Sequence, residues 1–412
     1  MAKTKKIIGL DIGSTKIACV IAESTNGKYN IIGYGRAHPD GFRNGTVVNL
    51  DTAVDSVALA IDSAEKMASI SAKNCSIYVG IAGQYIKHIP SGATVPVKNP
   101  SKGISEKDII EVIRQAQTLR LPNDEQIIHV LPGQYIVDGQ KGIKNPIGMF
   151  GFRLEVEALL IIGQIGALEN IHRVLDRLEL RNRALVLQAQ ALASVVSEPE
   201  DRELGIAIID IGGFTDISIF KDGELRFYKT LPIGGENITK DIAIGLRTPY
   251  KKAEEIKKQY GTAMVSCIDQ DEPIIIEDLS GRISKQVSRR LLTSIIEPRV
   301  EEILQYTETA IKESNFADTL SSGIILTGGT AQLKGIDIMA EQILRLPVKI
   351  APAKSSTDIH PEHSNNSLEQ LGADYTTAVG LIHYGFFGKE AYVLQGESIL
   401  STMASKIKEL FA

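Results

Sequence analysis

The sequence predicts an α/β protein of two related lobes that face a shared cleft, with a small inserted subdomain. At 412 residues the chain is too long for a single hydrophobic core, so two or more domains are expected. The triplet Asp11-Ile12-Gly13 joins two strand-like runs in the first half, and Asp210-Ile211-Gly212 joins two more in the second half. This weak internal repeat indicates one strand-turn-strand unit in each lobe. The sequence pattern changes over residues 85–157, which are predicted to form the insertion.

The first lobe is predicted to begin with three strands and a helix. Apolar and polar residues alternate in the strands, and Asp51 is the expected N-cap of the helix. The expected elements are strands over 6–10, 16–22 and 30–37, a helix over 51–69 and a strand over 75–82. Residues 164–200 then add a helix, a strand and a second helix.

The insertion is predicted to be a strand-helix-strand-strand unit. Ser105 and Asp108 form the acidic version of a capping box, which marks the start of its helix. Strand-like runs follow near residues 126–138 and 153–162.

The second lobe is predicted to open with a buried strand over 205–209. A helix-rich stretch over 234–313 separates this strand from another over 323–327, and a helix over 369–384 closes the lobe. A short linker then leads to a terminal helix.

Composition argues against a nucleic-acid partner. Trp is absent and aromatic residues make up 5% of the chain, so platforms for base stacking are few. The formal net charge of -5 also disfavours general binding to a phosphate backbone.

Cysteine usage and hydropathy favour a cytoplasmic protein. The three cysteines are widely spaced, which implies neither a disulfide framework nor a thiolate metal site. Asp11 and Lys16 interrupt the N-terminal apolar run, so it is neither a signal peptide nor a membrane span. His360 and His363 flank a proline, which favours a polar loop over a metal site.

The turn Asp11-Ile12-Gly13-Ser14-Thr15-Lys16 has the chemistry of a phosphate-binding loop. Gly13 lets the backbone approach an anion closely, and the following N–H groups and hydroxyls can donate to phosphate oxygens. Lys16 adds a positive charge, and Asp11 can hold the hydration shell of Mg²⁺. Taken alone, the turn is equally compatible with a plain hairpin.

Three further glycine-rich segments favour the phosphate-binding interpretation. Residues 210–216 repeat the acid-then-glycine order, residues 326–331 follow a buried strand and start a helix, and Gly234-Gly235 opens another helix. Glu236 and Lys240 on that helix could reach a ribose or a base edge. Each segment is a weak signal, but the ordered set of four predicts a polyphosphate clamped between two lobes.

These segments are similar to those of the actin, Hsp70 and sugar-kinase superfamily, and within it the chain resembles the FtsA family of bacterial cell-division proteins. The resemblance covers nearly the whole chain, and its most specific parts are residues 104–108, 231–243, 296–302 and the C-terminal helix. It implies an actin-like two-lobed fold with a duplicated ribonuclease-H-like core. The implied boundaries are 1–84 and 158–200 for the first lobe (1A), 85–157 for the inserted subdomain (1C), 201–232 and 310–386 for the second-lobe core (2A), 233–309 for subdomain 2B, 387–398 for a linker, and 399–412 for an amphipathic membrane-targeting helix.

The resemblance implies an ATP·Mg²⁺ site between the lobes. Asp11 and Asp210 would hold Mg²⁺ through water. The nucleotide contacts would come from Gly13, Ser14, Thr15, Lys16, Gly212, Gly213, Phe214, Thr215, Gly234, Gly235, Glu236, Lys240, Gly328, Gly329, Thr330 and Leu333.

Two departures from the family pattern predict at most a weak ATPase. Phe214 follows Gly213 where the family has a longer glycine run, so its side chain is expected to crowd the phosphate. Gln188 falls where the superfamily often has an acid or amide that orients the attacking water. Glutamine can orient water but cannot accept its proton, so slow hydrolysis is expected. Gln188 could equally be only a polar residue at a helix start.

The resemblance also implies a place at the division ring. FtsA proteins polymerise, attach to the inner face of the cytoplasmic membrane at the division site, recruit the C-terminal tail of FtsZ, and work with later division proteins. Arginine suits the carboxylates of that tail, and the docking residues are expected to be Arg282, Arg289, Arg290 and Arg299 on one long helical pattern over 282–302. The alternative is an ordinary solvated helix face.

The last fourteen residues are predicted to form an amphipathic helix. On a helical wheel the apolar residues fall in one sector about 120° wide. These are Ile399, Leu400, Met403, Ile407, Leu410 and Phe411. The sequence predicts weak binding of a single copy to a membrane, and a helix docked on protein is the alternative.

Other functions in the superfamily remain as alternatives. A sugar kinase would need a catalytic acid and a sugar-binding loop, and neither can be identified. An Hsp70-like chaperone would need an appended peptide-binding domain after the second lobe. A pilus-assembly adaptor shares the fold, but the amphipathic C-terminal pattern favours the FtsA-like role.

Overall fold

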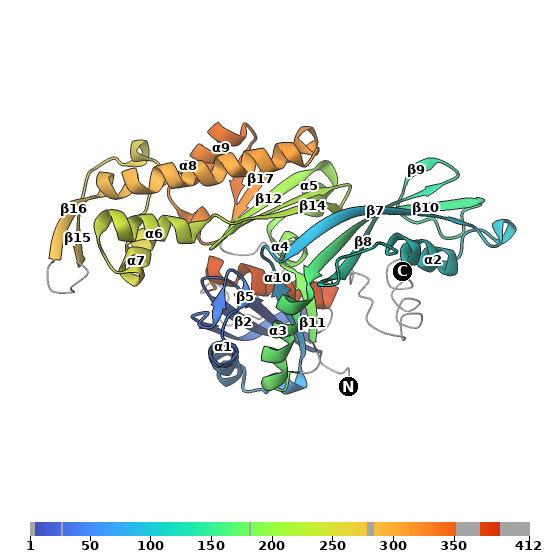
Figure 1. Cartoon of the computed structure of the whole chain (residues 1–412), viewed down its shortest axis with the longest axis horizontal. Coiled ribbons are helices and arrows are strands. Elements are labelled where there is room, and N and C mark those ends of the chain that lie inside the picture. The colour runs from blue at the N-terminus through green and yellow to red at the C-terminus, as the bar shows by residue number, and fades with distance from the viewer. Residues whose placement is uncertain (1–4, 26–27, 181–182, 278–283, 352–370, 388–412) are drawn as a thin grey trace.

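Two sheets of the same design form the centre of the molecule, and a third sheet projects away from them (Figure 1). The computed structural model describes residues 5–25, 28–180, 183–277, 284–351 and 371–387. Two large hydrophobic cores and one smaller core stabilise these parts, as expected for a chain of this length.

The first sheet has the strand order β11-β6-β1-β2-β3. Its central strand is fully buried after its first residue, because both faces are covered by helices. The strands are β1 (Lys6–Ile12), β2 (Ile17–Thr25), β3 (Lys28–Ala37), β6 (Ser76–Ile81) and β11 (Arg183–Leu187), with α1 (Leu50–Ala68), α3 (Ile165–Arg177) and α4 (Gln188–Val196) around them. The small hairpin of β4 (Phe42–Arg43) and β5 (Thr46–Val47) lies between β3 and α1 in the chain.

The second sheet, with the order β14-β13-β12-β17-β18, repeats the first. In both sheets the first two strands of the lobe form an antiparallel hairpin, and the central strand pairs in parallel with its other neighbour. The strands are β12 (Ile206–Ile211), β13 (Thr215–Lys221), β14 (Glu224–Leu231), β17 (Ile324–Thr327) and β18 (Val348–Ile350). The shared order confirms the predicted duplication of one core in two lobes.

The helices of the second half form the remainder of the second lobe, together with a hairpin. They are α5 (Pro199–Leu204), α6 (Gly235–Leu246), α7 (Tyr250–Tyr260), α8 (Arg289–Glu313) and α9 (Ile336–Leu344). The hairpin pairs β15 (Pro273–Glu277) with β16 (Ser284–Ser288). It corrects the expectation of one long helical pattern over 282–302, because Ser284–Ser288 form β16 and alternating apolar residues in β15 fill one side of the hairpin.

The inserted subdomain has its own sheet, of order β7-β10-β8-β9, and its own core. Its elements are β7 (Ile86–Pro96), α2 (Glu106–Ala116), β8 (Glu125–Val137), β9 (Gln140–Ile143) and β10 (Arg153–Gln164). Both halves of the capping box predicted for α2 are present, and the Ser105 N–H donates to Asp108 Oδ2 at 2.9 Å. The strand-helix-strand-strand prediction is confirmed, with β9 added as a short edge strand.

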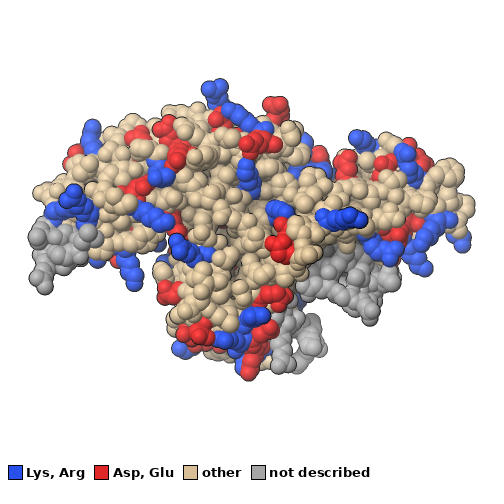
Figure 2. Space-filling model, viewed as in Figure 1, with Lys and Arg blue, Asp and Glu red and all other residues tan. Residues whose placement is uncertain are grey.

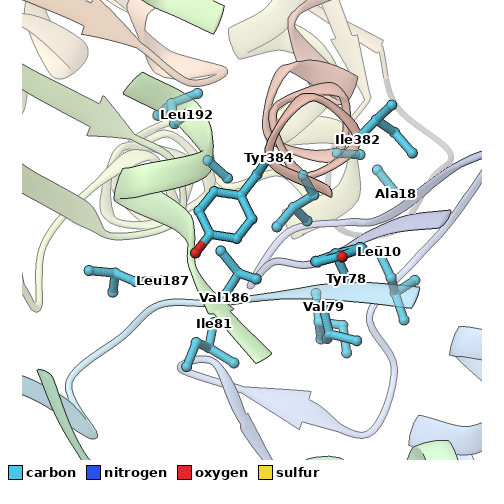
Figure 3. Packing of buried hydrophobic residues seen from close by; sticks show 14 of the residues in the cluster. Leu10, Ala18, Tyr78, Val79, Ile81, Val186, Leu187, Leu192, Ile382 and Tyr384 are labelled. Carbon is cyan, nitrogen blue, oxygen red and sulfur yellow. The ribbon is translucent and has the colours of Figure 1, made fainter. Parts of the chain in front are cut away.

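The C-terminal helix α10 (Thr376–Phe387) lies in a place that the sequence did not predict. The helix was expected over 369–384 as the end of the second lobe, but it packs against α4 and the sheet of the first lobe (Figure 3). The ring of Tyr384 packs edge-on against that of Tyr78 on β6, whereas Ile382 lies on the side of α10 near Ala18 of β2. A Cβ added to Gly380 would lie 2.5 Å from the Ala191 carbonyl oxygen, so glycine is what allows α10 to approach α4 so closely.

Two helix starts also differ from expectation. The N-cap of α1 is Asn49, whose side chain accepts hydrogen bonds from the backbone N–H groups of Asp51 and Thr52 at 3.1 and 3.2 Å. Asp51 is therefore the second residue of the helix, where its charge still favours the helix dipole. The segment after β17 begins with a single 3₁₀ turn, Thr330–Gln332, and α9 starts only at Ile336.

Within the described residues, no helix has the length and apolar character needed to cross a membrane. The predicted amphipathic segment, residues 399–412, lies outside the described residues.

Candidate functional site

A cleft of about 770 Å³ lies between the two lobes and is lined by residues from both. This volume is within the range of sites that hold a small molecule or a cofactor. All four glycine-rich segments contribute to its lining, although they are far apart in the sequence. From these segments the cleft is lined by Asp11–Lys16, Asp210, Gly212–Phe214, Asp216, Gly235 and Thr327–Thr330, and Leu333 adds to the lining just after the last of them.

The two predicted phosphate turns touch each other across the cleft. The first turn is closed by the Gly13 N–H, which donates to the Lys16 carbonyl oxygen at 2.9 Å. A Cβ added to Gly213 in the second turn would lie 2.9 Å from the Cβ of Ser14 and 3.2 Å from Cγ2 of Thr15. Glycine at 213 therefore allows the turns to meet, and an anion held by one turn would also contact the other.

Two carboxylates, one buried and one half-buried, lie at equivalent positions in the two lobes. Asp11 is near the end of β1 and Asp210 near the end of β12, and each lines the cleft. Burial raises the pKa of Asp11 to about 6, against the opposing effect of Lys16. Burial and the neighbouring Asp216 raise the pKa of Asp210 to about 7. A cation nearby would stabilise the charged form of both carboxyl groups and so lower their pKa values.

These carboxylates suit a hydrated cation better than a directly coordinated one. Among the described residues, no group of three or more His, Cys, Asp or Glu side chains could hold a metal ion directly. Mg²⁺ commonly keeps several waters and takes one or two carboxylates plus substrate phosphates. Asp11 and Asp210 therefore fit the predicted role of holding Mg²⁺ through water.

Gln188 lies beside the first of these carboxylates. It is the first residue of α4, directly after β11, and its Nε2 donates to Asp11 Oδ1 at 2.8 Å. Its amide can orient a water molecule in the cleft but cannot take a proton from it. Slow ATP hydrolysis therefore stays a prediction. Phe214, the second residue expected to slow hydrolysis, is half-buried on the cleft wall.

The two glycines of the 326–331 segment have different surroundings. Gly328 has φ +88, and a Cβ there would lie 2.3 Å from Asp210 Oδ1. A Cβ on Gly329 would meet no atom within 4 Å. Gly328 therefore shapes the turn around Asp210, whereas Gly329 borders open space in the cleft.

Helix α7 supplies three cleft residues that the sequence reasoning missed: Glu254, Lys257 and Lys258. Lys257 is only 7% exposed and donates to the Gly235 carbonyl at 3.0 Å and to Thr239 Oγ1 at 2.8 Å. It also pairs with Glu254 at 2.7 Å. Burial would raise the pKa of Glu254, but Lys257 beside it lowers that pKa overall.

The available signal for this helix was its periodicity. Lys257 follows Ala253 by four residues, so it shares the buried face of α7 with Ala253 and Ile256. A lysine on an apolar helix face needs a polar partner or a ligand, and this requirement could have identified Lys257 as a candidate site residue.

Four predicted contact residues do not line the cleft. Thr215 is fully buried, and its hydroxyl donates to the Ile233 carbonyl at 2.8 Å. Gly234 lies beneath the second turn, where a Cβ would be 2.5 Å from the Gly213 carbonyl oxygen. Glu236 is half-buried behind Gly213, and Lys240 is exposed one turn further along α6. Glu254 and Lys257, rather than Glu236 and Lys240, are the charged pair on that wall.

The predicted docking arginines do not form one free basic face. Arg299 pairs with Asp241 at 2.6 Å and also contacts Glu302. Arg289 donates to the Tyr260 carbonyl and to Thr262 Oγ1, both at 3.2 Å. Arg290 is exposed at the start of α8. Arg282 lies outside the described residues, as do Ile399, Leu400, Met403, Ile407, Leu410 and Phe411.

Comparison with protein families identifies two parts of the chain. A family model described as cell division protein FtsA matches residues 207–380. A second model, described as the SHS2 domain inserted in FtsA, matches residues 83–162, which include the inserted sheet except for the last two residues of β10.

Curated relatives match over almost the whole chain. A cell division protein FtsA of Pseudomonas aeruginosa is 34% identical over 386 residues, covering 92% of this chain and 89% of the relative. The FtsA of Bacillus subtilis is 34% identical, with 93% and 84% covered, and that of Escherichia coli K12 is 33% identical, with 98% and 96% covered.

Solved structures agree on the fold. The PilM–PilN type IV pilus biogenesis complex contains a chain with TM-score 0.63 and 16% identity, covering 92% of this chain and 98% of that one. MreB5 of Spiroplasma citri bound to ADP gives TM-score 0.55 and 15% identity, with 92% and 96% covered. MreB5 bound to AMPPNP gives TM-score 0.55 and 13% identity, with 99% of both chains covered. At such identities the likeness shows the actin-like fold alone.

Proposed function

The chain belongs to the FtsA family of cell division proteins, and we propose that it binds ATP with Mg²⁺ in the cleft between its lobes. The observation that carries this proposal is the pair of carboxylates, buried Asp11 and half-buried Asp210, each followed by a glycine turn that faces the other lobe. The nucleotides bound to the similarly folded MreB5 support it.

Different residues of the cleft would contact different parts of the nucleotide. Backbone N–H groups of the two turns would donate to phosphate oxygens, and Lys16 would add a positive charge. Asp11 and Asp210 would hold the waters of Mg²⁺, which neutralises phosphate charge when bound. Lys257 and Glu254 would meet the nucleoside end, near Gly329. Gln188 would orient water without accepting its proton, so the protein would be at most a weak ATPase.

The raised pKa values predict a pH dependence for Mg²⁺-assisted ATP binding. A protonated carboxyl cannot hold the hydrated cation, and the pKa values are about 7 for Asp210 and about 6 for Asp11. As pH falls through this range, ATP affinity with Mg²⁺ should drop on the order of tenfold relative to affinity at about pH 8. Titration calorimetry at several pH values measures this directly.

The phosphate of the nucleotide itself titrates near the same pH. A matched variant distinguishes the pH dependence that comes from the protein from that of the nucleotide. Asp210→Asn should bind ATP·Mg²⁺ more weakly at high pH and should lose the part of the pH dependence centred near 7. If wild type and Asp210→Asn show the same pH profile, Asp210 does not hold the cation.

We further propose that the protein forms filaments and tethers FtsZ to the cytoplasmic face of the cell membrane at the division site, where it recruits later division proteins. FtsA relatives along nearly the full chain support this role. The sequence of residues 399–412, with its six apolar positions on one helical face, supports the membrane contact.

The start of α8 and the β15–β16 hairpin offer the surface that best fits the FtsZ tail. Basic side chains, with acidic ones between them, lie at this end of the second lobe (Figure 2). Ile275 on β15 is 75% exposed and Leu291 on α8 is 48% exposed, next to Arg290. Arginine beside exposed apolar side chains suits a peptide that carries both carboxylates and apolar residues.

Arg290→Glu should weaken binding of an FtsZ-tail peptide, on the order of tenfold at low salt, because an attractive charge becomes repulsive. Fluorescence anisotropy of a labelled peptide measures the change. Lys312→Glu, at the opposite end of α8, is the control and should bind as wild type. Arg299 is unsuitable as a test, because its pair with Asp241 is structural. Equal peptide affinity in Arg290→Glu and wild type would remove this surface from the interface.

A further inference from the structure

An acidic residue on a short segment just before α10 pairs with two cations that line the cleft. We call this segment, Gly372–Tyr375, the strap. Its Asp374 forms ion pairs with Lys16 of the first phosphate turn, at 3.5 Å, and with Arg36 of β3. All three side chains line the cleft.

Asp374 is held as a carboxylate. Burial would raise the pKa of Asp374, but Lys16 and Arg36 lower it below the ordinary value, with Lys258 of the second lobe contributing. Its charge reaches the cation site as well, since Asp374 helps to raise the pKa of Asp11. A fixed negative charge therefore stands beside the lysine that belongs to the predicted phosphate turn.

We propose that Asp374 competes with the nucleotide phosphates for Lys16 and Arg36, and so reduces the preference of the cleft for a triphosphate over a diphosphate. This inference rests on the proposed nucleotide site and adds a residue that sets its specificity. A carboxylate and a phosphate accept the same charge-assisted hydrogen bonds, so Lys16 cannot serve both fully. The repulsion grows with the charge of the ligand and is therefore greatest for ATP.

Close packing of α10 against the first lobe means that nucleotide binding would displace only the strap. A Cβ added to Gly9 of β1 would lie 2.2 Å from the Ala378 carbonyl oxygen, and Gly380 packs as tightly against Ala191. The first turns of α10 are thus locked onto the first lobe. The strap is less enclosed, since Gly372 is exposed and Asp374 and Tyr375 are half-buried. Phosphates that take Lys16 would displace the Asp374 side chain without moving the helix.

Asp374→Asn tests the inference, because it keeps the size of the side chain and removes its charge. We expect affinity, measured with fluorescent analogues without Mg²⁺ so that the phosphates keep their full charge, to rise on the order of tenfold for ATP, two- to threefold for ADP and little for AMP. Asp55→Asn, which removes an exposed carboxylate on α1, is the control for net charge and should leave all three affinities unchanged.

Two results would overturn the proposal. Equal changes for ATP, ADP and AMP would show that Asp374 does not act on the phosphates. A loss of ATP affinity that appears only with Mg²⁺ would show that Asp374 supports the cation instead. A thermal unfolding midpoint equal to that of wild type establishes that the variant is folded. Failure of wild type to bind any nucleotide would reject the nucleotide site itself, which is a distinct outcome.

Discussion

Replacing Gly329 with leucine should abolish ATP binding while the protein stays folded. A side chain at this position begins in open space, since a Cβ meets no atom within 4 Å, and it would extend into the cleft that both lobes line. A pocket binds by surrounding most of its ligand, so filling part of it removes contacts with the nucleoside and blocks its position. We expect an affinity loss of at least about a hundredfold in titration calorimetry, which corresponds to about 2.8 kcal/mol.

The neighbouring glycines provide controls for this substitution. Gly166→Leu, on the exposed face of α3, also meets no atom and should bind ATP as wild type. Gly328→Ala should instead disturb the turn itself, because a Cβ there collides with Asp210 and φ is +88. Wild-type ATP affinity in a folded Gly329→Leu protein would place the nucleotide elsewhere.

Deleting residues 399–412 should abolish membrane binding and leave ATP binding intact. Full burial of a large apolar side chain contributes roughly 1.5–3 kcal/mol, and the segment carries six such positions. Ordering each backbone residue costs about 1–2 kcal/mol, so the two sums are similar and one copy should bind marginally. A filament that presents many copies side by side would bind firmly through effective concentration. Co-sedimentation with liposomes measures the loss.

Single substitutions locate the effect on one face of the predicted helix. Phe411→Glu places a charge on the apolar side and should abolish co-sedimentation, whereas Ser405→Glu adds the same charge on the opposite side and should weaken it much less. Strong liposome binding by the truncated protein would refute the tail as the anchor. Equal binding by a strictly monomeric form would refute the role of the filament.

Local sequence patterns were enough to predict that both turns line the cleft. The buried strand, the acid at its end and the glycine after it recur at Asp11 and Asp210, and both turns line one cleft. Their chemistry is local, because a turn that donates N–H groups to an anion needs only its own residues. The capping box at Ser105 predicted the start of α2 for the same reason.

Residues that enter the cleft from other elements could not be found in this way. Lys257 lines the cleft from a helix of the second lobe, and Asp374 lines it from the strap. The neighbouring sequence of these residues does not indicate that Lys257 contacts Gly235 or that Asp374 contacts Lys16. The opposite error occurred at Thr215, which belongs to the second turn but points to Ile233. In a strand, adjacent side chains point to opposite faces, so membership of a turn does not decide which side chain faces the ligand.

The sequence by itself determined that the chain has two duplicated lobes with an acid-and-glycine turn in each, an inserted subdomain and a family, because turns, caps and alternation are properties of short segments. Only the tertiary structure decided that α10 belongs to the first lobe, that Asp374 faces Lys16, and that Arg299 is occupied by Asp241. An apolar pattern shows that a helix such as α10 is buried, and a charge shows that a side chain needs a partner. Neither specifies which distant surface supplies it, because that depends on how the whole chain packs.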